Sequence, residues 1–175
     1  MMALRFAAIV GLLLLGACAE PLVVPMGPPA GAPRLLDDRL VMADGAELPL
    51  KRWLPEATPR AVILGLHGFN DYSNAFAIPA AEWTKEGIAT YAFDQRGFGG
   101  APHRGRWAGT ATMVADLDAA VRLIAARHPG LPLAVVGESM GGAVALVAAA
   151  RGELPALDGV VFVAPAVREI GRAHV

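Results

Sequence analysis

The feature that most constrains this chain is an apolar run that breaks at a Gly-x-Ser-x-Gly turn and then resumes. The first run ends at Val135-Val136, the turn is Gly137-Glu138-Ser139-Met140-Gly141, and the second run covers residues 143–150. This order predicts a strand, a sharp turn and a helix. Such a turn strains the backbone of its serine, and it requires glycines two residues to either side because side chains there would clash with the strand and the helix.

Ser139 is therefore the candidate nucleophile, since the turn presents its hydroxyl at the end of the sheet. The helix that follows directs its N-terminal amides to the same point, so an oxyanion would find a donor in the Met140 N–H. The alternative is a chance occurrence of the motif in a chain with 20 glycines. The flanking apolar runs favour the nucleophile. So does the scarcity of serine, because the chain contains only Ser73 and Ser139.

Charge and composition exclude several classes of function. The net charge is -1 and the pI is near 6.4, which gives no electrostatic reason to expect a nucleic-acid partner. His103 and His128 lack metal-ligand spacing, and the chain has no His-Glu-x-x-His or Cys-x-x-Cys motif. We therefore expect no metal site and no cofactor.

Residues 1–17 are expected to be a signal peptide of the lipoprotein type. Arg5 precedes an apolar run over residues 6–17, which is shorter than the roughly 20 residues that span a bilayer. The sequence Leu15-Gly16-Ala17-Cys18 resembles a bacterial lipobox, in which Cys18 receives lipid. Cys18 is the only cysteine, so it cannot form an intramolecular disulfide. We expect a lipid-anchored protein of the bacterial cell envelope, periplasmic or on the outer surface. The alternative is an ordinary signal peptide that is cleaved elsewhere.

Residues 18–36 form a proline-rich linker in this interpretation. Its composition favours extended polyproline II structure, and at about 3.1 Å per residue it could hold a domain some tens of ångströms from the membrane. The prolines are Pro21, Pro25, Pro28, Pro29 and Pro33.

Residues 37–168 are predicted to form one α/β domain. Residues 39–53 suggest a hairpin with an Asp44-Gly45 turn, in which Pro49 favours an edge position for the second strand. The unbroken apolar run over residues 61–66 predicts a strand that is covered on both faces. Further apolar strands are predicted over residues 89–93, 133–136 and 159–163.

Two further helices are expected between these strands. Residues 74–86 precede Gly87, which suits the position after a helix, and Thr112 is a plausible N-cap for a helix that ends near His128. Strands that alternate with helices indicate a mostly parallel sheet with helices on both faces.

Three motifs then resemble those of the α/β-hydrolase superfamily. They are Leu66-His67-Gly68-Phe69-Asn70, Asp94-Gln95-Arg96-Gly97-Phe98-Gly99 and Gly137-Glu138-Ser139-Met140-Gly141-Gly142, each after a predicted strand. Within the superfamily the chain is most similar to the monoacylglycerol lipase and lysophospholipase-like branch, of serine aminopeptidase S33 type. The resemblance covers residues 40–164 and implies the N-terminal part of that fold, without its last strands and cap.

The resemblance also implies roles for residues around Ser139. The Phe69 N–H would be the second oxyanion donor beside Met140, and Gly68 would let the backbone pass close to the site. His67 precedes the serine, whereas the family's base follows it, so a structural role for His67 is favoured over a catalytic one. Asp94 is expected to fix its glycine-rich turn.

Other charged and aromatic residues receive simpler interpretations. Asp116, Asp118 and Asp158 are expected to be solvated charges. Trp53, Trp83 and Trp107 are expected to pack rather than bind, although Trp107 lies in an arginine-rich segment that could border the mouth of a substrate site.

The family places its acid and base after two further strands, and the only histidine after Ser139 is His174. Residues 169–175 resemble the translation of a common sequencing adapter. We therefore expect a non-native tail there, a parent protein nearly twice as long, and a chain that lacks the triad Asp and His and is inactive by itself. The alternative is a genuine short protein. Without further strands, residues 160–163 would be an exposed apolar edge.

The expected function of the parent is hydrolysis of carboxylic esters, of monoacylglycerol or lysophospholipid type, through an acyl-enzyme on Ser139. The alternative is a non-catalytic envelope lipoprotein that uses a degenerate hydrolase domain for binding. The partners would be a small acyl ester and, through Cys18, a membrane.

Overall fold

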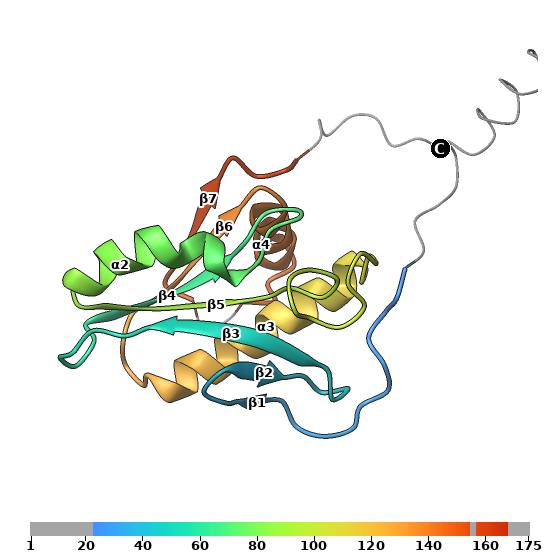
Figure 1. Ribbon diagram of the computed structural model, residues 1–175, viewed down its shortest axis with the longest axis horizontal. Coiled ribbons are helices and arrows are strands. Elements are labelled where there is room, and N and C mark those ends of the chain that lie inside the picture. Colours follow the sequence, from blue (N-terminus) through green and yellow to red (C-terminus); the bar gives the residue numbers. More distant parts are fainter. Residues whose placement is uncertain (1–22, 155–156, 168–175) are drawn as a thin grey trace, which may run out of the picture.

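A mixed sheet runs through the domain in the computed structural model, which describes residues 23–154 and 157–167 (Figure 1). Its strands within these residues are β1 (Arg34–Leu35), β2 (Arg39–Val41), β3 (Glu47–Trp53), β4 (Ala61–Leu66), β5 (Ile88–Phe93), β6 (Leu133–Glu138) and β7 (Gly159–Val163). The helices are the 3₁₀ helix η2 (Ser73–Phe76) and the α-helices α2 (Ala77–Lys85), α3 (Thr110–Arg127) and α4 (Met140–Ala150).

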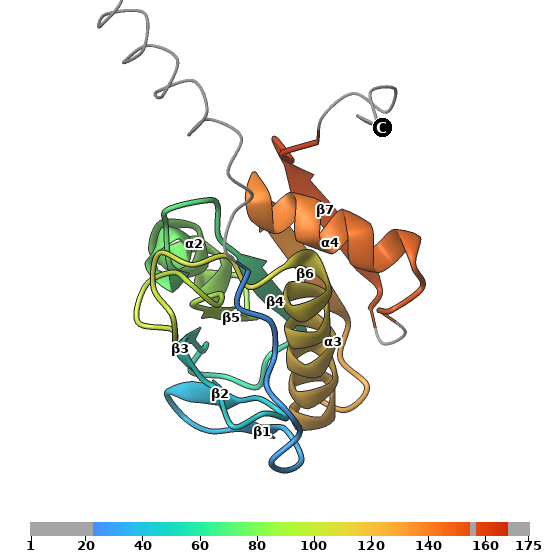
Figure 2. The same ribbon diagram turned by 90° about the vertical axis from the view of Figure 1, so that its right-hand side faces the viewer.

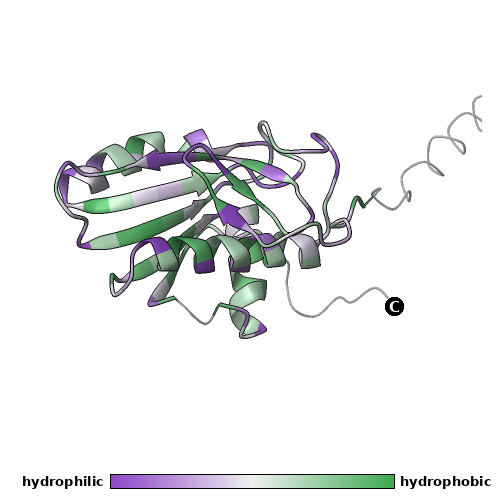
Figure 3. Cartoon of the chain, turned by 90° about the horizontal axis from the view of Figure 1, so that it is seen from below, coloured by the Kyte–Doolittle hydropathy of each residue, from purple (hydrophilic) through white to green (hydrophobic). Residues whose placement is uncertain are grey.

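The strand order is β1-β2-β3-β5-β4-β6-β7. Strands β4 to β7 pair in parallel, whereas β1, β2 and β3 pair antiparallel. Helix α2 covers one face of the sheet, and α3 and α4 pack together on the other (Figure 2). The central strands are accordingly apolar, and α3 presents a hydrophobic side to them (Figure 3). The predicted α/β sheet with helices on both faces is confirmed.

The edge position predicted for the strand with Pro49 is wrong. Strand β3 lies inside the sheet, but it exchanges partners along its length: its first half pairs with β2 and its second half with β5. Pro49 stands at this change. Its carbonyl accepts a hydrogen bond from the Asp94 N–H at 2.8 Å, which ties this point of the strand to the end of β5.

The predicted N-cap of α3 is also wrong, because the helix begins three residues earlier than an N-cap at Thr112 would require. The N-cap is Gly109 at φ 84, and Thr112 lies inside the first turn. The Thr112 hydroxyl instead accepts the Met26 N–H at 3.1 Å. The hydroxyl of a threonine near the start of a helix can form a hydrogen bond with its own backbone or with a separate segment. Here it bonds the separate segment that contains Met26.

The described part of the proline-rich segment, from Val23 onward, is not a free spacer. The N–H groups of Ala30 and Gly31 donate to the Ala43 carbonyl at 2.6 and 3.1 Å, and β1 extends the sheet before residue 37. Several of its backbone N–H groups donate to the domain, which holds the segment against the surface.

The predicted signal peptide, Cys18 and the tail at residues 169–175 lie outside the described residues. Among the residues that are described, no helix is long and apolar enough to cross a membrane.

Candidate active site

Ser139 occupies the junction between β6 and α4. Its φ is 47°, a left-handed value that is uncommon for a residue with a side chain, and it is the residue that immediately precedes the helix. The glycines around it are required because a larger side chain would not fit at their positions. A Cβ at Gly137 would lie 2.7 Å from the Gly141 carbonyl oxygen, and one at Gly141 would lie 2.3 Å from that of Leu66. The strand, strained turn and helix predicted from the motif are therefore present.

Gly141→Ala tests this packing directly. The added methyl group would press on the backbone of β4, which cannot move aside, so we expect the free energy of unfolding to fall by about 3 kcal/mol. Urea denaturation measures the change. Gly159→Ala is the matched control, because a Cβ there meets nothing within 4 Å. Equal stability of the two variants would contradict the steric argument.

Backbone bonds from the end of β7 hold the serine in place. The Ser139 N–H donates to the Val163 carbonyl at 2.9 Å, and the Ser139 carbonyl accepts the Ala166 N–H at 2.9 Å and the Ala143 N–H at 3.0 Å. The strained residue is thus bonded on both its amide and its carbonyl. These bonds stabilise a conformation that an isolated turn would not keep.

The loop after β4 lies beside the serine. A Cβ at Gly68 would be 3.4 Å from the Ser139 Cβ, so the backbone of this loop passes directly beside the serine. The next residue, Phe69, donates no backbone hydrogen bond to any described residue. The Met140 N–H begins α4, and the first amides of a helix have no acceptor within it. The structure therefore brings the predicted oxyanion donors to the same end of the sheet as Ser139.

His67 is buried, and both of its ring nitrogens form hydrogen bonds. Its Nδ1 donates to the Gly68 carbonyl at 2.8 Å and its Nε2 accepts the Gln95 N–H at 3.0 Å, which requires the neutral ring. Burial lowers the pKa of His67, against the opposing effect of the bond to Gly68. With both ring nitrogens occupied, His67 has none free to take a proton from the serine.

Asp94 fixes the glycine-rich loop after β5, as predicted. Its carboxylate is buried and accepts the N–H groups of Ser73 and Gly100, both at 2.8 Å. A Cβ at Gly99 would lie 2.1 Å from the same carboxylate. The loop is thereby held open beside the loop that carries Phe69.

A pocket of about 610 Å³ lies between these loops. Phe69 and Phe98 form part of its wall with their rings edge to face, 5.4 Å apart. Arg104, Arg106 and Trp107 line another part, and Trp107 also packs against the hydrophobic core. Ser139 does not line this pocket itself, but it adjoins Gly68, next to Phe69.

Comparison with known proteins decides the family, since residues 57–173, more than half of the chain, match the family described as serine aminopeptidase, S33. The chain belongs to this family. It is 33% identical over 118 residues to the monoacylglycerol lipase of Mycolicibacterium smegmatis, which covers 66% of the chain and 41% of that protein. It is 32% identical over 136 residues to the human monoglyceride lipase, covering 73% of the chain and 42% of that protein.

Solved structures agree on the α/β-hydrolase fold. A soluble variant of the monoglyceride lipase from Saccharomyces cerevisiae, in complex with a substrate analog, matches with a TM-score of 0.63 at 24% identity. That match covers 84% of this chain and 47% of the yeast protein. A carboxyl esterase from Bacillus coagulans matches with a TM-score of 0.62 at 22% identity. The chain spans about two fifths of the length of the curated relatives it matches.

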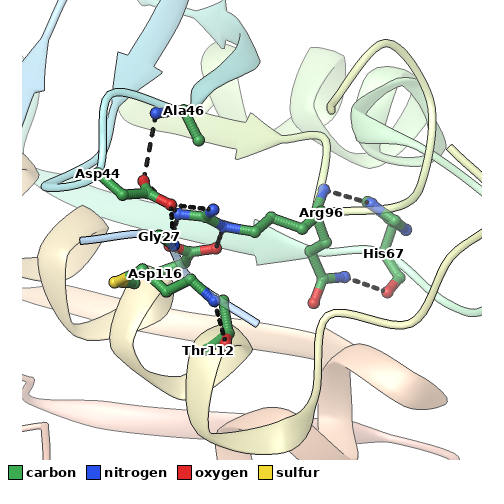
Figure 4. A network of polar contacts seen from close by, with 9 residues as sticks. Gly27, Asp44, Ala46, His67, Arg96, Thr112 and Asp116 are labelled. Atoms are coloured by element: carbon green, nitrogen blue, oxygen red, sulfur yellow. Dashed lines mark hydrogen bonds and ion pairs between the residues drawn. The ribbon is translucent and has the colours of Figure 1, made fainter. Parts of the chain in front are cut away.

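Asp116 corrects the sequence interpretation, because it is buried and not a solvated charge. In Figure 4, Arg96 lies between two carboxylates: its guanidinium donates to Asp116 at 2.6 and 3.0 Å and to Asp44 at 2.6 and 2.9 Å. The side chains are only 5%, 2% and 6% exposed for Arg96, Asp116 and Asp44. The network joins the hairpin turn, the loop after β5 and α3 beneath the pocket wall.

The three charges of this network influence one another strongly. Burial raises the pKa of Asp116 to about 6, and the hydrogen bonds and charge of Arg96 oppose this rise. The Arg96 guanidinium holds the pKa of Asp44 well below its usual range, assisted by the N–H groups of Gly27 and Ala46.

Asp158, another predicted solvated charge, accepts the Leu133 N–H at 2.8 Å at the start of β6. Asp118 forms an outward ion pair with Arg122.

No general base stands beside the serine within residues 23–154 and 157–167. The Ser139 hydroxyl has no hydrogen-bond partner there, His67 is occupied, and His128 contacts Tyr91 through its Nε2 at 2.8 Å. In the same part of the chain, no three His, Cys, Asp or Glu side chains gather in a way that could hold a metal ion.

Proposed function

We propose that the full-length protein is a serine hydrolase that cleaves carboxylic esters of small acyl glycerols, with monoacylglycerol or lysophospholipid as substrate. The observation that carries the proposal is the strained Ser139 between β6 and α4, with two free amides close to it. The S33 family and the monoglyceride lipases among its relatives support an ester substrate.

In the proposed reaction, Ser139 Oγ attacks the acyl carbon and loses its proton to a base. The Met140 and Phe69 N–H groups stabilise the negative oxygen of the tetrahedral intermediate. The intermediate expels the glycerol-bearing alcohol, which takes up the proton, and leaves the acyl group on the serine. Water then attacks the acyl-enzyme with help from the same base and releases the fatty acid.

We place the acid and the base of this reaction in a longer parent protein. Strand β7 supports this placement, because Val161, Phe162 and Val163 are 52%, 40% and 46% exposed along one edge of the sheet. An apolar edge of this kind normally pairs with another strand. Without an activating base, the 175-residue chain is expected to hydrolyse esters at no more than a trace rate.

The proposal includes an anchor in the bacterial cell envelope through lipid on Cys18, which rests on the lipobox sequence alone.

A second candidate function is favoured by one observation, the absence of a base beside Ser139 among the described residues. In that case the domain would be a non-catalytic envelope lipoprotein that binds an acyl ligand in the pocket beside Phe69.

Labelling with a fluorophosphonate probe distinguishes the two functions. An activated Ser139 in the full-length protein should be labelled, and peptide mapping should locate the label on Ser139. Ser73→Ala is the matched control, because Ser73 is buried and is the other serine of the 175-residue sequence. A folded full-length protein that takes up no label would refute the hydrolase and favour the binding function.

A further inference from the structure

Residues 94–109, which we call the wall loop, connect β5 to α3 and form most of the wall of the pocket. Seven of the ten residues that line the pocket belong to this loop, and the other three are Phe69, Asn70 and Asp71. The shape of the pocket on this side therefore depends on the contacts that hold the wall loop in place.

The first half of the wall loop is anchored by its own side chains. The Asp94 carboxylate accepts the Ser73 N–H at 2.8 Å, and Gln95 Nε2 donates to the His67 carbonyl at 2.8 Å. Arg96 adds its bonds to the two carboxylates described above. The side chains of Asp94, Gln95 and Arg96 are all buried, so this half of the loop is fixed from inside the domain.

The second half of the wall loop is held by backbone hydrogen bonds. The Gly105 N–H donates to the Gly97 carbonyl at 2.8 Å, and this bond stays within the loop. In the described part of the chain, one backbone hydrogen bond joins residues 102–108 to a segment outside the loop. It runs from the Val24 N–H to the Trp107 carbonyl, at 2.8 Å. The course of the backbone before α3 therefore depends on a segment that lies far away in the sequence.

Val24 belongs to residues 23–31, which we call the N-terminal strap. The strap runs alongside α3 (Figure 2) and donates further hydrogen bonds, from the Met26 N–H to Thr112 at 3.1 Å and from the Gly27 N–H to Asp44 at 3.0 Å. None of its residues is buried in the described domain. Hydrogen bonds, rather than packing in the core, therefore place the strap on the domain.

The Gly27 bond reaches the start of the wall loop through Asp44. In Figure 4, Asp44 lies between the strap and Arg96, and its Oδ2 accepts the Gly27 N–H at 3.0 Å and the Arg96 Nη1 at 2.6 Å. Because Asp44 and Asp116 share one guanidinium, the two buried carboxylates are not fully neutralised at pH 7. Backbone N–H groups, including that of Gly27, supply part of the remaining stabilisation. The strap thus helps to hold the carboxylate that fixes Arg96.

We propose that the N-terminal strap is a positioning segment for the wall loop. The Val24 N–H fixes the end of the loop at Trp107, and the Gly27 N–H fixes its start at Arg96 through Asp44. Both ends of the pocket wall are thereby bonded, directly or through one side chain, to the same short stretch of backbone.

The strap acts on the pocket and not on the nucleophile turn. Ser139 is held by its own bonds to Val163 and Ala166, and none of these involves the strap. Loss of the strap bonds therefore loosens the wall that a ligand contacts, while the serine and its oxyanion donors keep their places. The consequence for a substrate rests on the proposed function, whereas the positioning of the loop does not.

Proline substitutions remove the two donors, because proline has no backbone N–H. Val24 and Gly27 each precede a proline, and a residue in that place is restricted to the extended backbone that a further proline also adopts. In the full-length protein, we expect Val24→Pro combined with Gly27→Pro to speed hydrogen–deuterium exchange of the amides of residues 97–107 by about five- to tenfold. The amides of residues 139–146 should change less than twofold. Mass spectrometry of peptic fragments measures both.

Val24→Thr combined with Gly27→Ala is the matched control. Threonine has nearly the shape of valine, and both substitutions keep the backbone N–H. A Cβ at Gly27 would lie 3.5 Å from its nearest neighbour, the Asp44 Cβ, which is an ordinary contact. Exchange in the wall loop of this control should match that of the unchanged protein.

Kinetics test the consequence for the substrate if the proposed function holds. The proline variant should raise KM for a monoacylglycerol by about five- to tenfold and leave kcat within twofold, because it changes binding and not the groups that act on the acyl carbon. Labelling of Ser139 by a small fluorophosphonate should keep its rate. An active enzyme with a faster-exchanging wall loop and an unchanged KM would overturn the role of the strap in ligand binding.

The positioning role is overturned if the wall loop exchanges no faster in the proline variant than in the matched control. It is equally overturned if exchange rises as much around Ser139 as in the wall loop, since that would show a general loss of stability. Exchange requires no turnover. A protein that takes up no fluorophosphonate would therefore refute the proposed hydrolase and would still show whether the strap positions the loop.

Discussion

Ser139→Ala in the full-length protein is expected to lower kcat/KM for a monoacylglycerol on the order of 10⁶-fold. The alanine removes the attacking oxygen but leaves the backbone of the turn unchanged. The amides of Met140 and Phe69 would remain, so a small rate above that of water would persist. Release of fatty acid from a micellar monoacylglycerol measures the effect.

Ser73→Ala is the control, with an expected change of less than twofold, because Ser73 is buried at the start of η2 and does not belong to the turn. A Ser139→Ala protein that keeps a tenth or more of its activity would show that another residue forms the acyl intermediate.

Arg96→Met is expected to lower the free energy of unfolding at pH 7 by about 3–5 kcal/mol. Methionine has a similar length but no charge, so Asp44 and Asp116 would remain buried without a counter-ion. The pocket wall that follows Arg96 along the chain should loosen as well. Urea denaturation measures the loss of stability.

Asp116→Asn is the matched control, because it keeps the shape of the side chain and leaves Arg96 paired with Asp44. We expect it to cost less than about 1.5 kcal/mol at pH 7. If Arg96→Met costs no more than Asp116→Asn, the charge network does not stabilise the fold.

Asp116→Asn should also change how the free energy of unfolding depends on pH. Burial raises the pKa of Asp116 in the folded protein to about 6, above its ordinary value of 3.8, so the folded state binds this proton more tightly than the unfolded state. The contribution of Asp116 to the free energy of unfolding therefore increases as the pH falls from 7 to about 4. Asp116→Asn should remove that increase from the pH profile, measured as the difference between the two proteins.

The turn around Ser139 could be predicted from the sequence because its causes are local. The glycines at 137 and 141 are fixed by contacts within a few residues and with one neighbouring strand, and the apolar runs on both sides define that strand and helix. The same holds for half of the contacts of Asp94: Gly100 lies six residues away in the loop that Asp94 fixes, whereas Ser73 lies 21 residues away.

The network of Arg96 could not be predicted because its members are remote from one another. Asp44 and Asp116 lie 52 and 20 residues from Arg96, and nothing in the neighbourhood of Asp116 distinguishes a buried carboxylate from a solvated one. The N-cap role predicted for Thr112 is wrong for a related reason. Its hydroxyl accepts a hydrogen bond from Met26, 86 residues away, and no local sequence pattern reveals that partner. The position of Pro49 likewise depends on which strands flank it in three dimensions.

The bonds that hold Ser139 from the end of β7 have a consequence for how the protein is made. Both partners, Val163 and Ala166, follow the serine by more than twenty positions. A ribosome adds residues one at a time, at about 5–20 per second, so Ser139 is synthesised and can leave the exit tunnel before either partner does. The nucleophile turn acquires these ties only when the nascent chain has extended past Ala166, so its strained conformation is completed after the strand and the helix on either side of it have been synthesised.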